Sequence, residues 1–337
     1  MFRKQPTARV ETHALHLADL PHFMRLVGQG ILLDSAMMTS LDGDVPQESP
    51  LAPLLPTRNL HTLVTRGKQQ TVLGQFRLIR SEWAAPRAQL NYLAPRALAH
   101  TDESACLHLL DALTAAAGRR EAHSLNAEVD ERSPLFETMR RAGFAVYARQ
   151  ELWRRAGNGN RAGNAAHSGA SIPWQKASAG DRTEMRQLLR SLVPPMLLQT
   201  LEQPAANAGW LYREEGQVLA ILALHRGRRA ASLLPYFHPR LAGRIADLLR
   251  GALALLPTRQ PCFLTLRRYQ DWWGETLPAL GFLRQVQQGL LVRHIATSIR
   301  AKHFADELLE ALEKGITPAL EMRTVPPPFQ QPTRRSA

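Results

Sequence analysis

The sequence predicts an α/β (α+β) protein in which one fold is built twice. Strand and helix patterns alternate in the order β-β-β-α-β-α-β after an N-terminal helical region, and this order occurs in both halves. Gly143-Phe144 and Gly281-Phe282 lie 138 residues apart, and helices that begin near Ser104 and Ala242 share this offset. A fixed offset across several elements indicates a tandem duplication, so we expect each half to place a mixed central sheet between helices.

Apolar spacing and turn residues set the expected element bounds. In the first half we expect helices at 17–29, 104–117 and 134–142, and strands at 60–69, 71–80, 87–94, 125–129 and 145–153. In the second half we expect helices at 179–201, 244–256 and 271–280, and strands at 209–213, 217–225, 229–237, 262–267 and 286–295. Gly118 is expected to cap its helix, and Gly143 and Gly281 to adopt the left-handed conformation that glycine tolerates best.

Composition shifts predict the domain organisation. Residues 1–155 form an N-terminal domain, 156–171 a Gly/Asn-rich linker, 172–300 a C-terminal domain, and 301–337 a short helix and a Pro-rich tail. Because the linker has almost no apolar side chain to bury, we expect the two halves to fold separately.

The cysteines and the apolar runs exclude several classes of protein. Cys106 and Cys262 are too few for a disulfide framework, and we expect both to be buried core thiols. No signal peptide or transmembrane run is evident, so we expect a soluble, cytoplasmic protein without a membrane partner. His13 and His16 lack a third ligand, and no metal is expected.

The net charge is +13, and Arg outnumbers Lys 37 to 5. Residues 161–337 carry most of the excess. Codon bias and a solvated surface explain this charge, or else the second half meets an anion such as a phosphorylated cofactor. No long basic run, helix-turn-helix or zinc-finger spacing supports nucleic acid as a partner.

Two matching segments carry a family resemblance. Phe136–Trp153 and Thr276–Ile295 each run from a short helix through Gly-Phe into a strand, and TVLGQFRLIR and GQVLAILALH fit the preceding hairpins. This pattern resembles the GNAT superfamily of acyl-CoA-dependent N-acyltransferases, arranged as two tandem domains, over most of residues 10–155 and 172–298. The resemblance implies a loop Q/R-x-x-G-x-G/A for the CoA pyrophosphate, a splayed strand whose backbone N–H polarises the thioester, and a tyrosine that protonates the leaving thiolate.

The first half departs from the phosphate-loop pattern. Its loop is PRALAHTDESA, and no glycine occurs between Gly74 and Gly118. We expect Thr101 to cap the next helix, with Asp102 and Glu103 in its first turn. Those carboxylates would repel a pyrophosphate at the same place, so this half is not expected to hold CoA in the usual way.

The second half matches the pattern in part. In HPRLAGRIAD, Arg240 and Gly243 take the first two family positions, while Ile245 replaces the last small residue. We predict that Arg240, Gly243, Arg244 and Ala246 bind the cofactor. The alternative is an ordinary helix N-terminus whose arginines face solvent.

Neither half has the family's tyrosine, which is expected four residues before the glycine of Gly-Phe. Met139 and Leu277 occupy these positions. The nearest titratable groups are His238 and Tyr269, expected at the ends of two adjacent strands, and we predict these as catalytic residues. A surface histidine is the alternative for His238. Pro235 marks a bulge or an edge and fits a splayed strand.

The resemblance therefore implies an N-acyltransferase that moves an acetyl group from acetyl-CoA to a small-molecule or peptide amine. Acyl-CoA would be held in the second half, and transfer would be slow without the usual acid. The alternative is a non-catalytic tandem GNAT-fold module that binds a ligand or a protein.

Overall fold

The computed structural model describes residues 11–40, 59–67, 70–80, 84–96, 102–157, 174–200, 209–227, 229–256 and 260–295. The first half contains β1 (Glu11–Ala14), α1 (Leu20–Leu26), β2 (Ile31–Leu32), α2 (Ser35–Ser40), β3 (Leu60–Arg66), β4 (Thr71–Ile79), β5 (Arg87–Ala94), α4 (Glu103–Gly118), β6 (Ser124–Asp130), α5 (Pro134–Arg141) and β7 (Ala145–Arg155). Short 3-10 turns flank α1 as η1 (Leu17–Asp19) and η2 (Val27–Gln29).

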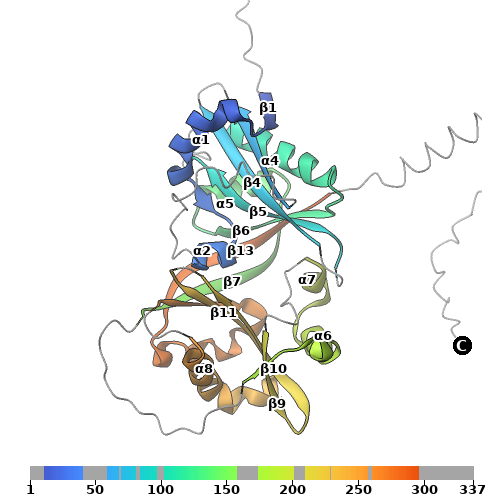
Figure 1. Cartoon of the computed structure of the whole chain (residues 1–337), viewed down its shortest axis with the longest axis vertical. Coiled ribbons are helices and arrows are strands. Elements are labelled where there is room, and N and C mark those ends of the chain that lie inside the picture. The colour runs from blue at the N-terminus through green and yellow to red at the C-terminus, as the bar shows by residue number, and fades with distance from the viewer. Residues whose placement is uncertain are drawn as a thin grey trace, which may run out of the picture. The chain divides into compact units, whose positions relative to one another are not determined.

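The second half repeats this order. It contains β8 (Gln175–Lys176), η3 (Ala179–Asp181), α6 (Arg182–Leu192), α7 (Pro195–Thr200), β9 (Gly209–Glu214), β10 (Gln217–Arg226), β11 (Ala231–Phe237), η4 (Pro239–Arg244), α8 (Ile245–Ala254), β12 (Cys262–Arg267), η5 (Arg268–Thr276), η6 (Pro278–Leu280) and β13 (Leu283–His294). The predicted α/β class and the duplicated order are confirmed, as Figure 1 shows.

Some expected bounds were wrong for local reasons. The single helix expected at 179–201 is broken after Leu192, where Val193 turns extended ahead of Pro194. Residues 271–280 form 3-10 turns rather than an α-helix. Gly118 is the last residue of α4, and Arg119 takes the cap position in a right-handed conformation. Residues 158–171 of the linker expected at 156–171, and the short helix and tail expected at 301–337, lie outside the described residues.

The glycines that end the paired helices behave as predicted. Gly143 and Gly281 have φ of 85° and 80°. The next residues, Phe144 and Phe282, are buried, and their amides donate to Met139 and Leu277 at 3.1 Å. The N-terminal turns repeat as well, because Asp19 accepts from Arg66 and Asp181 accepts from Arg213. These matched contacts support the duplication.

The two halves exchange their last strands, which the sequence did not suggest. All strands join one sheet in the order β1-β3-β4-β5-β6-β13-β7-β12-β11-β10-β9-β8, with β2 beside β5. Thus β13 of the second half pairs with β6 of the first, and β7 pairs with β12. The two exchanged strands also pair with each other, with Gln150 opposite Gln288. Figure 1 shows both strands crossing between the halves.

The exchange argues against the expectation that the halves fold separately, which stays untested. Each half borrows a strand whose backbone hydrogen bonds complete its own part of the sheet. The side chains are exchanged too: Arg155 lies over Gly281, and its counterpart Arg293 lies over Gly143. The domain bounds at 155 and 172 stay a prediction, but Met1–Ala296 form one compact unit.

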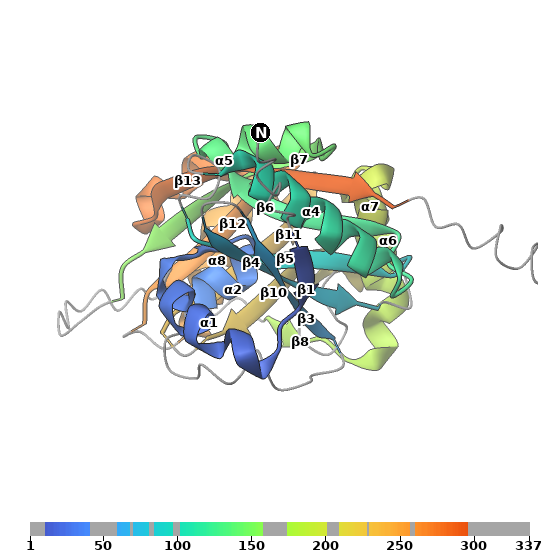
Figure 2. The same ribbon diagram turned by 90° about the horizontal axis from the view of Figure 1, so that it is seen from above.

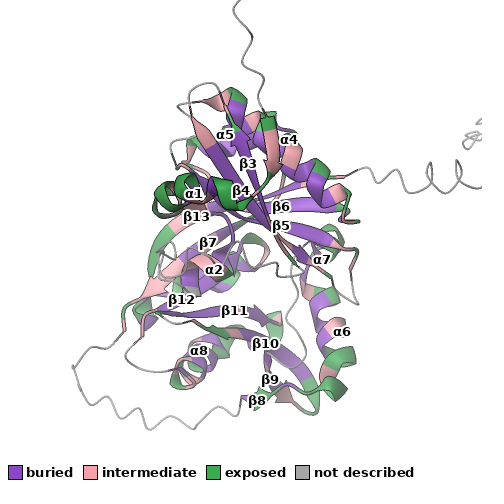
Figure 3. Cartoon of the chain, turned by 45° about the horizontal axis from the view of Figure 1, so that its top comes forward, coloured by how far each residue is buried: buried purple, intermediate pink, exposed green. Residues whose placement is uncertain are grey.

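Helices cover both faces of the sheet. In the first half α4 and α5 pack on one face and α1 and α2 on the other, as Figure 2 shows. In the second half α8 packs on one face and α6 on the other. The strands are mostly buried, whereas the outer faces of these helices are exposed (Figure 3). Cys106 and Cys262 are buried thiols, as predicted, and burial raises the pKa of each to about 12. Within the described residues, no helix is long and apolar enough to cross a membrane.

Candidate functional site

The sheet opens at one place in each half, where two parallel strands diverge. In the first half β5 and β6 pair only at Ala88–Leu125 and Gln89–Asn126. In the second half β11 and β12 pair at three positions and separate beyond Leu233–Leu264. Beyond these points the facing edges no longer satisfy each other, so backbone groups become available to another chain or to a ligand.

The first opening is filled by the protein's own chain. Residues of β2 pair with β5 as Ile31–Leu93 and Leu32–Tyr92. The following residue, Leu33, bridges both sides: its amide donates to Asn91 at 2.9 Å, and its carbonyl accepts from the Glu128 amide at 3.0 Å. Leu33 is fully buried in the core under α4. The segment therefore takes the place that a ligand would need between β5 and β6.

Close packing fixes this filling segment. A Cβ added at Gly30 would lie 2.0 Å from the Tyr92 ring, so the glycine lets the chain pass the aromatic side chain. The Tyr92 hydroxyl donates to the Leu26 carbonyl at 2.9 Å. Together these contacts hold residues 30–33 against β5.

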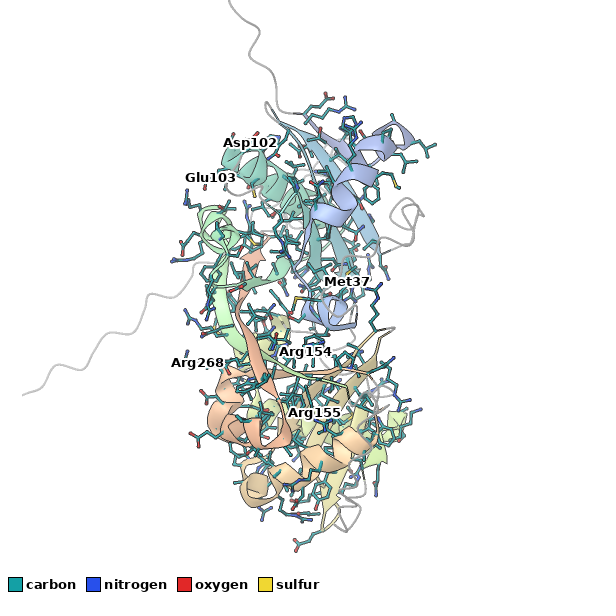
Figure 4. All side chains as sticks on the ribbon, turned by 90° about the vertical axis from the view of Figure 1, so that its left-hand side faces the viewer. Met37, Asp102, Glu103, Arg154, Arg155 and Arg268 are labelled. Atoms are coloured by element: carbon teal, nitrogen blue, oxygen red, sulfur yellow. The ribbon has the colours of Figure 1, made fainter. Side chains whose placement is uncertain are left out.

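The start of α4 is closed to an anion as well. Asp102, and not Thr101 as expected, is the N-cap, and its carboxylate accepts from the Ala105 amide at 3.0 Å. Glu103 pairs with Arg141 at 2.5 Å. Figure 4 shows Asp102 and Glu103 together at this helix end. The Asp102 carboxylate takes up one first-turn donor, and both carboxylates place negative charge at the positive end of the helix dipole.

Among the described residues, no strand fills the second opening. The corresponding segment turns at Val193-Pro194-Pro195, where the prolines supply no N–H, and its described backbone bonds stay within α6 and α7. The edge of β11 beyond Leu233 carries Pro235 and Phe237. Because the His238 amide donates to Leu219 of β10, the Phe237 amide on the alternate edge points toward the opening.

Pro235 lies on the local edge that β11 presents beyond its last pair with β12, and not at a bulge. Its register with Leu222 of β10 is continuous, so the predicted bulge is absent there. In the first half the matching position is Asn91, and that strand does carry a register shift. Pro235 removes one donor from the opening and leaves the Phe237 N–H as the next one along the same edge.

The predicted cofactor residues follow β11 directly. Arg240 and Gly243 lie in η4, and a Cβ at Gly243 would meet nothing within 4 Å. Arg244, the N-cap of α8, pairs with Glu214 and lies 5.4 Å from the centre of the Tyr212 ring. Ala246 is in the first turn of α8, which also holds Asp247. Of the two arginines, Arg240 is exposed, while Arg244 is engaged within the protein.

The predicted catalytic residues lie at the ends of adjacent strands, but in different surroundings. His238 caps η4 by accepting from the Arg240 amide at 3.2 Å, and it lines an open groove of about 400 Å³ beside α6. Tyr269 packs against the α6 cluster, where burial raises the pKa of its hydroxyl and the oxygen has no hydrogen-bond partner. Met139 and Leu277, at the family tyrosine position, are fully buried and cannot transfer protons.

A cavity of about 350 Å³ lies between the halves, and the sequence did not reveal it. Its walls are the face of the sheet opposite α4 and α8, with α2 laid across it, as the position of α2 in Figure 1 indicates. At the centre, the Gln150 amide nitrogen donates to Gln288 at 2.8 Å and to the Ser35 hydroxyl at 3.1 Å. These two glutamines are related by the 138-residue repeat, so the cavity lies on the pseudo-twofold axis of the duplication.

Charged side chains face each other across this cavity. Arg267 of β12 is 7 % exposed, and its Nε and Nη1 atoms are buried without a hydrogen-bond partner. Glu128 of β6 accepts from the Ser35 amide at 2.7 Å. The pKa of the Glu128 carboxyl is raised, chiefly because the group is buried. The charge of Arg267 acts to lower this pKa, and the charge of Asp34 acts to raise it. Asp34 itself accepts from Arg77 at 3.3 Å.

No pattern in the sequence identified Glu128 and Arg267, because each lies in an ordinary strand. The one available signal was a charge at a strand position whose neighbours predict burial, such as Arg267 after CFLTL. Across the described ranges, no group of three metal-ligating side chains occurs.

Comparisons with solved structures agree with this architecture. A GCN5-related N-acetyltransferase from Sphaerobacter thermophilus matches 85 % of this chain and 96 % of its own length, with a TM-score of 0.53 and 12 % identity. A tandem GNAT protein from the clavulanic acid biosynthesis pathway matches 85 % and 98 %, with a TM-score of 0.50 and 13 % identity. No family model and no curated protein matches the sequence. The chain has the tandem GNAT fold, as the sequence resemblance implied.

Proposed function

We propose that the protein is an acyl-CoA-dependent N-acyltransferase whose second half holds the acyl-CoA. One observation supports this proposal: no described segment pairs with the β11 edge at the β11/β12 opening, whereas the protein's own residues 31–33 fill the β5/β6 opening. A sheet edge with unsatisfied groups pairs readily with an extended ligand. The pantetheine arm of CoA, which carries amide groups, is such a ligand.

The residues around the opening fit the parts of this cofactor. Exposed Arg240 follows β11 and suits the pyrophosphate, because a guanidinium binds phosphate oxygens in a bidentate manner. The Phe237 N–H is placed to donate to a thioester carbonyl at the opening. When bound, acyl-CoA supplies the activated acyl group. Within the chain, no tyrosine stands at the family position to protonate the thiolate, so we expect turnover to be slow.

Calorimetric titration of the full chain with acetyl-CoA tests the proposal. We expect one site per chain, because only one opening accepts the ligand. Arg240→Ala should weaken binding about tenfold or more, since a charge-assisted phosphate contact contributes about 1.5–3 kcal/mol. Arg250→Ala is the matched control, because Arg250 is an exposed arginine on α8 paired with Asp247. Absence of binding, or equal loss in both variants, would contradict the proposal.

The non-catalytic module remains a second candidate function. Pro235 removes a donor at the opening, and buried Met139 and Leu277 replace the acid. Both features reduce catalysis without preventing ligand binding. Acetyl-CoA binding without acetyl transfer to any amine offered would favour this candidate.

A further inference from the structure

The starting observation is the buried guanidinium of Arg267. In β12, Cys262, Leu264 and Leu266 point into the α8 core, so the alternating residue Arg267 points to the opposite face, into the cavity. No carboxylate among the described residues forms a direct ion pair with it, and the charge of Glu128 acts on it only from across the cavity. A buried guanidinium with two nitrogens that lack hydrogen-bond partners is costly, so its presence in a cavity wall indicates that an anion completes the site.

The opposite wall has the complementary chemistry. Glu128 lines the same cavity from β6, and among the described residues its hydrogen bonds come from Ser35 alone. Asn126, beside it, leaves its side-chain oxygen without a partner. These oxygen atoms accept hydrogen bonds and favour a cationic donor such as an ammonium group. The cavity therefore has a donor side and an acceptor side that do not contact each other.

We propose that this cavity binds a small zwitterion of the α-amino acid type. Arg267 holds the carboxylate, while Glu128 and Asn126 accept hydrogen bonds from the amine. A singly charged carboxylate matches one guanidinium, whereas a phosphate dianion would add repulsion from Glu128. The volume of about 350 Å³ suits a ligand of this size.

The location connects this ligand with the second opening. Leu234 of β11 and Thr265 of β12 line the cavity, and they flank the point where these strands separate. An amine in the cavity would reach the opening from the face opposite α8. That the bound amino acid accepts the acetyl group rests on the proposed function. That the cavity binds an amino acid does not.

The test measures the melting temperature of the full chain with each of the twenty α-amino acids at millimolar concentration, without acetyl-CoA. We expect at least one amino acid to raise it by about 3 °C or more. The amine that lacks only the carboxylate, such as cadaverine for lysine, should give no shift. Absence of a shift with every amino acid would overturn the proposal.

Variants assign the effect to the cavity. Arg267→Met should abolish the shift without lowering the melting temperature of the free protein, because a buried unpaired charge is replaced by an apolar side chain of similar length. Arg267→Lys keeps the charge but loses the planar fork, and it should weaken binding about tenfold. Arg250→Met, on the exposed face of α8, should keep the full shift. A shift that persists in both Arg267 variants would contradict the assignment.

A separate measurement distinguishes this proposal from the proposed function. Amino acid binding without acetyl-CoA binding would support the cavity and refute acyl transfer. Acetyl-CoA binding, with no amino acid that raises the melting temperature, would support the acyl-CoA site and refute the amino acid site in the cavity.

Discussion

The two openings in the sheet began as copies of one structure and now differ in what occupies them. Between β5 and β6, the Leu33 amide and carbonyl bridge Asn91 and Glu128, and carboxylates cap the adjoining helix. Between β11 and β12, two prolines prevent the matching segment from pairing, and Arg240 and Arg244 precede the helix. The comparison shows that one copy of a binding fold can become structural while the other keeps an accessible edge.

The same comparison explains the central cavity. Because the first opening is filled, α2 follows directly from β2 and lies across the sheet, where it contacts β10 and β11 of the second half. Figure 4 shows Met37 of α2 at this level, between the two sets of strands. The residues that follow the filling segment, Asp34, Ser35 and Ala36, form one wall of the cavity, so the loss of a site in one half contributes to a site shared by both.

The largest expected effect is on the rate of acetyl transfer. Pro235→Ala restores an N–H that points into the second opening, and one oxyanion donor contributes about 10²–10³-fold in other enzymes. We expect release of CoA thiol to rise, by up to about 10²-fold, with the amino acid that gives the largest melting shift. An unchanged rate would show that Phe237 or another donor already fills this role.

A matched pair of glycines tests the packing difference between the openings. Gly30→Ala places a Cβ against the Tyr92 ring and should destabilise the protein by about 1–3 kcal/mol in urea unfolding. Gly243→Ala meets open space and should change stability by less than about 0.5 kcal/mol. Equal effects of the two substitutions would contradict the filled-versus-open distinction.

A smaller effect is expected from the Glu128 carboxyl. Its pKa is raised in the folded protein, so the fold binds this proton more tightly than the unfolded chain does. That stabilisation is complete below the unfolded pKa and is lost as pH rises through the folded pKa. Arg267, Asp34 and His225 line the same cavity. Glu128→Gln should therefore raise the melting temperature by about 2 °C at pH 8 and by less at pH 4. A larger gain at pH 4 would reverse the sign and refute this account.

The smallest effect is expected from cutting the chain between the two halves: because of the exchanged strands, we expect the halves to stay together. A protease site inserted between Gly157 and Gly169 should allow the chain to be cut. The two fragments should still elute together in gel filtration, because β7 and β13 tie each half to the other. Separation into two stable fragments would restore the original expectation of independent domains.

Much of the fold followed from the sequence because its signals are local. Strand β5 and the turns at Gly143 and Gly281 were predicted correctly from residue periodicity and glycine placement. The strand exchange was not predictable, since β7 carries the same residues whichever half it pairs with. Strand β2 was missed because two residues give no periodicity, and its role depends on a gap elsewhere in the sheet.

The residues of the candidate site also fall into those that the sequence indicated and those that it did not. Asp102 and Arg240 were noticed because helix starts have a recognisable sequence pattern. Arg267, Glu128 and Gln150 line one cavity from three different strands. Single-sequence reasoning cannot place such residues together, because their meeting depends on long-range pairing.

Amide hydrogen exchange of the full chain, with and without acetyl-CoA, tests the central claim most directly. If the second opening alone accepts the ligand, acetyl-CoA should slow exchange in peptides that span residues 234–246, including the Phe237 amide. Peptides that span residues 87–96 and 102–106 should be unchanged. Protection at β5 and the start of α4, with none at β11, would contradict the account.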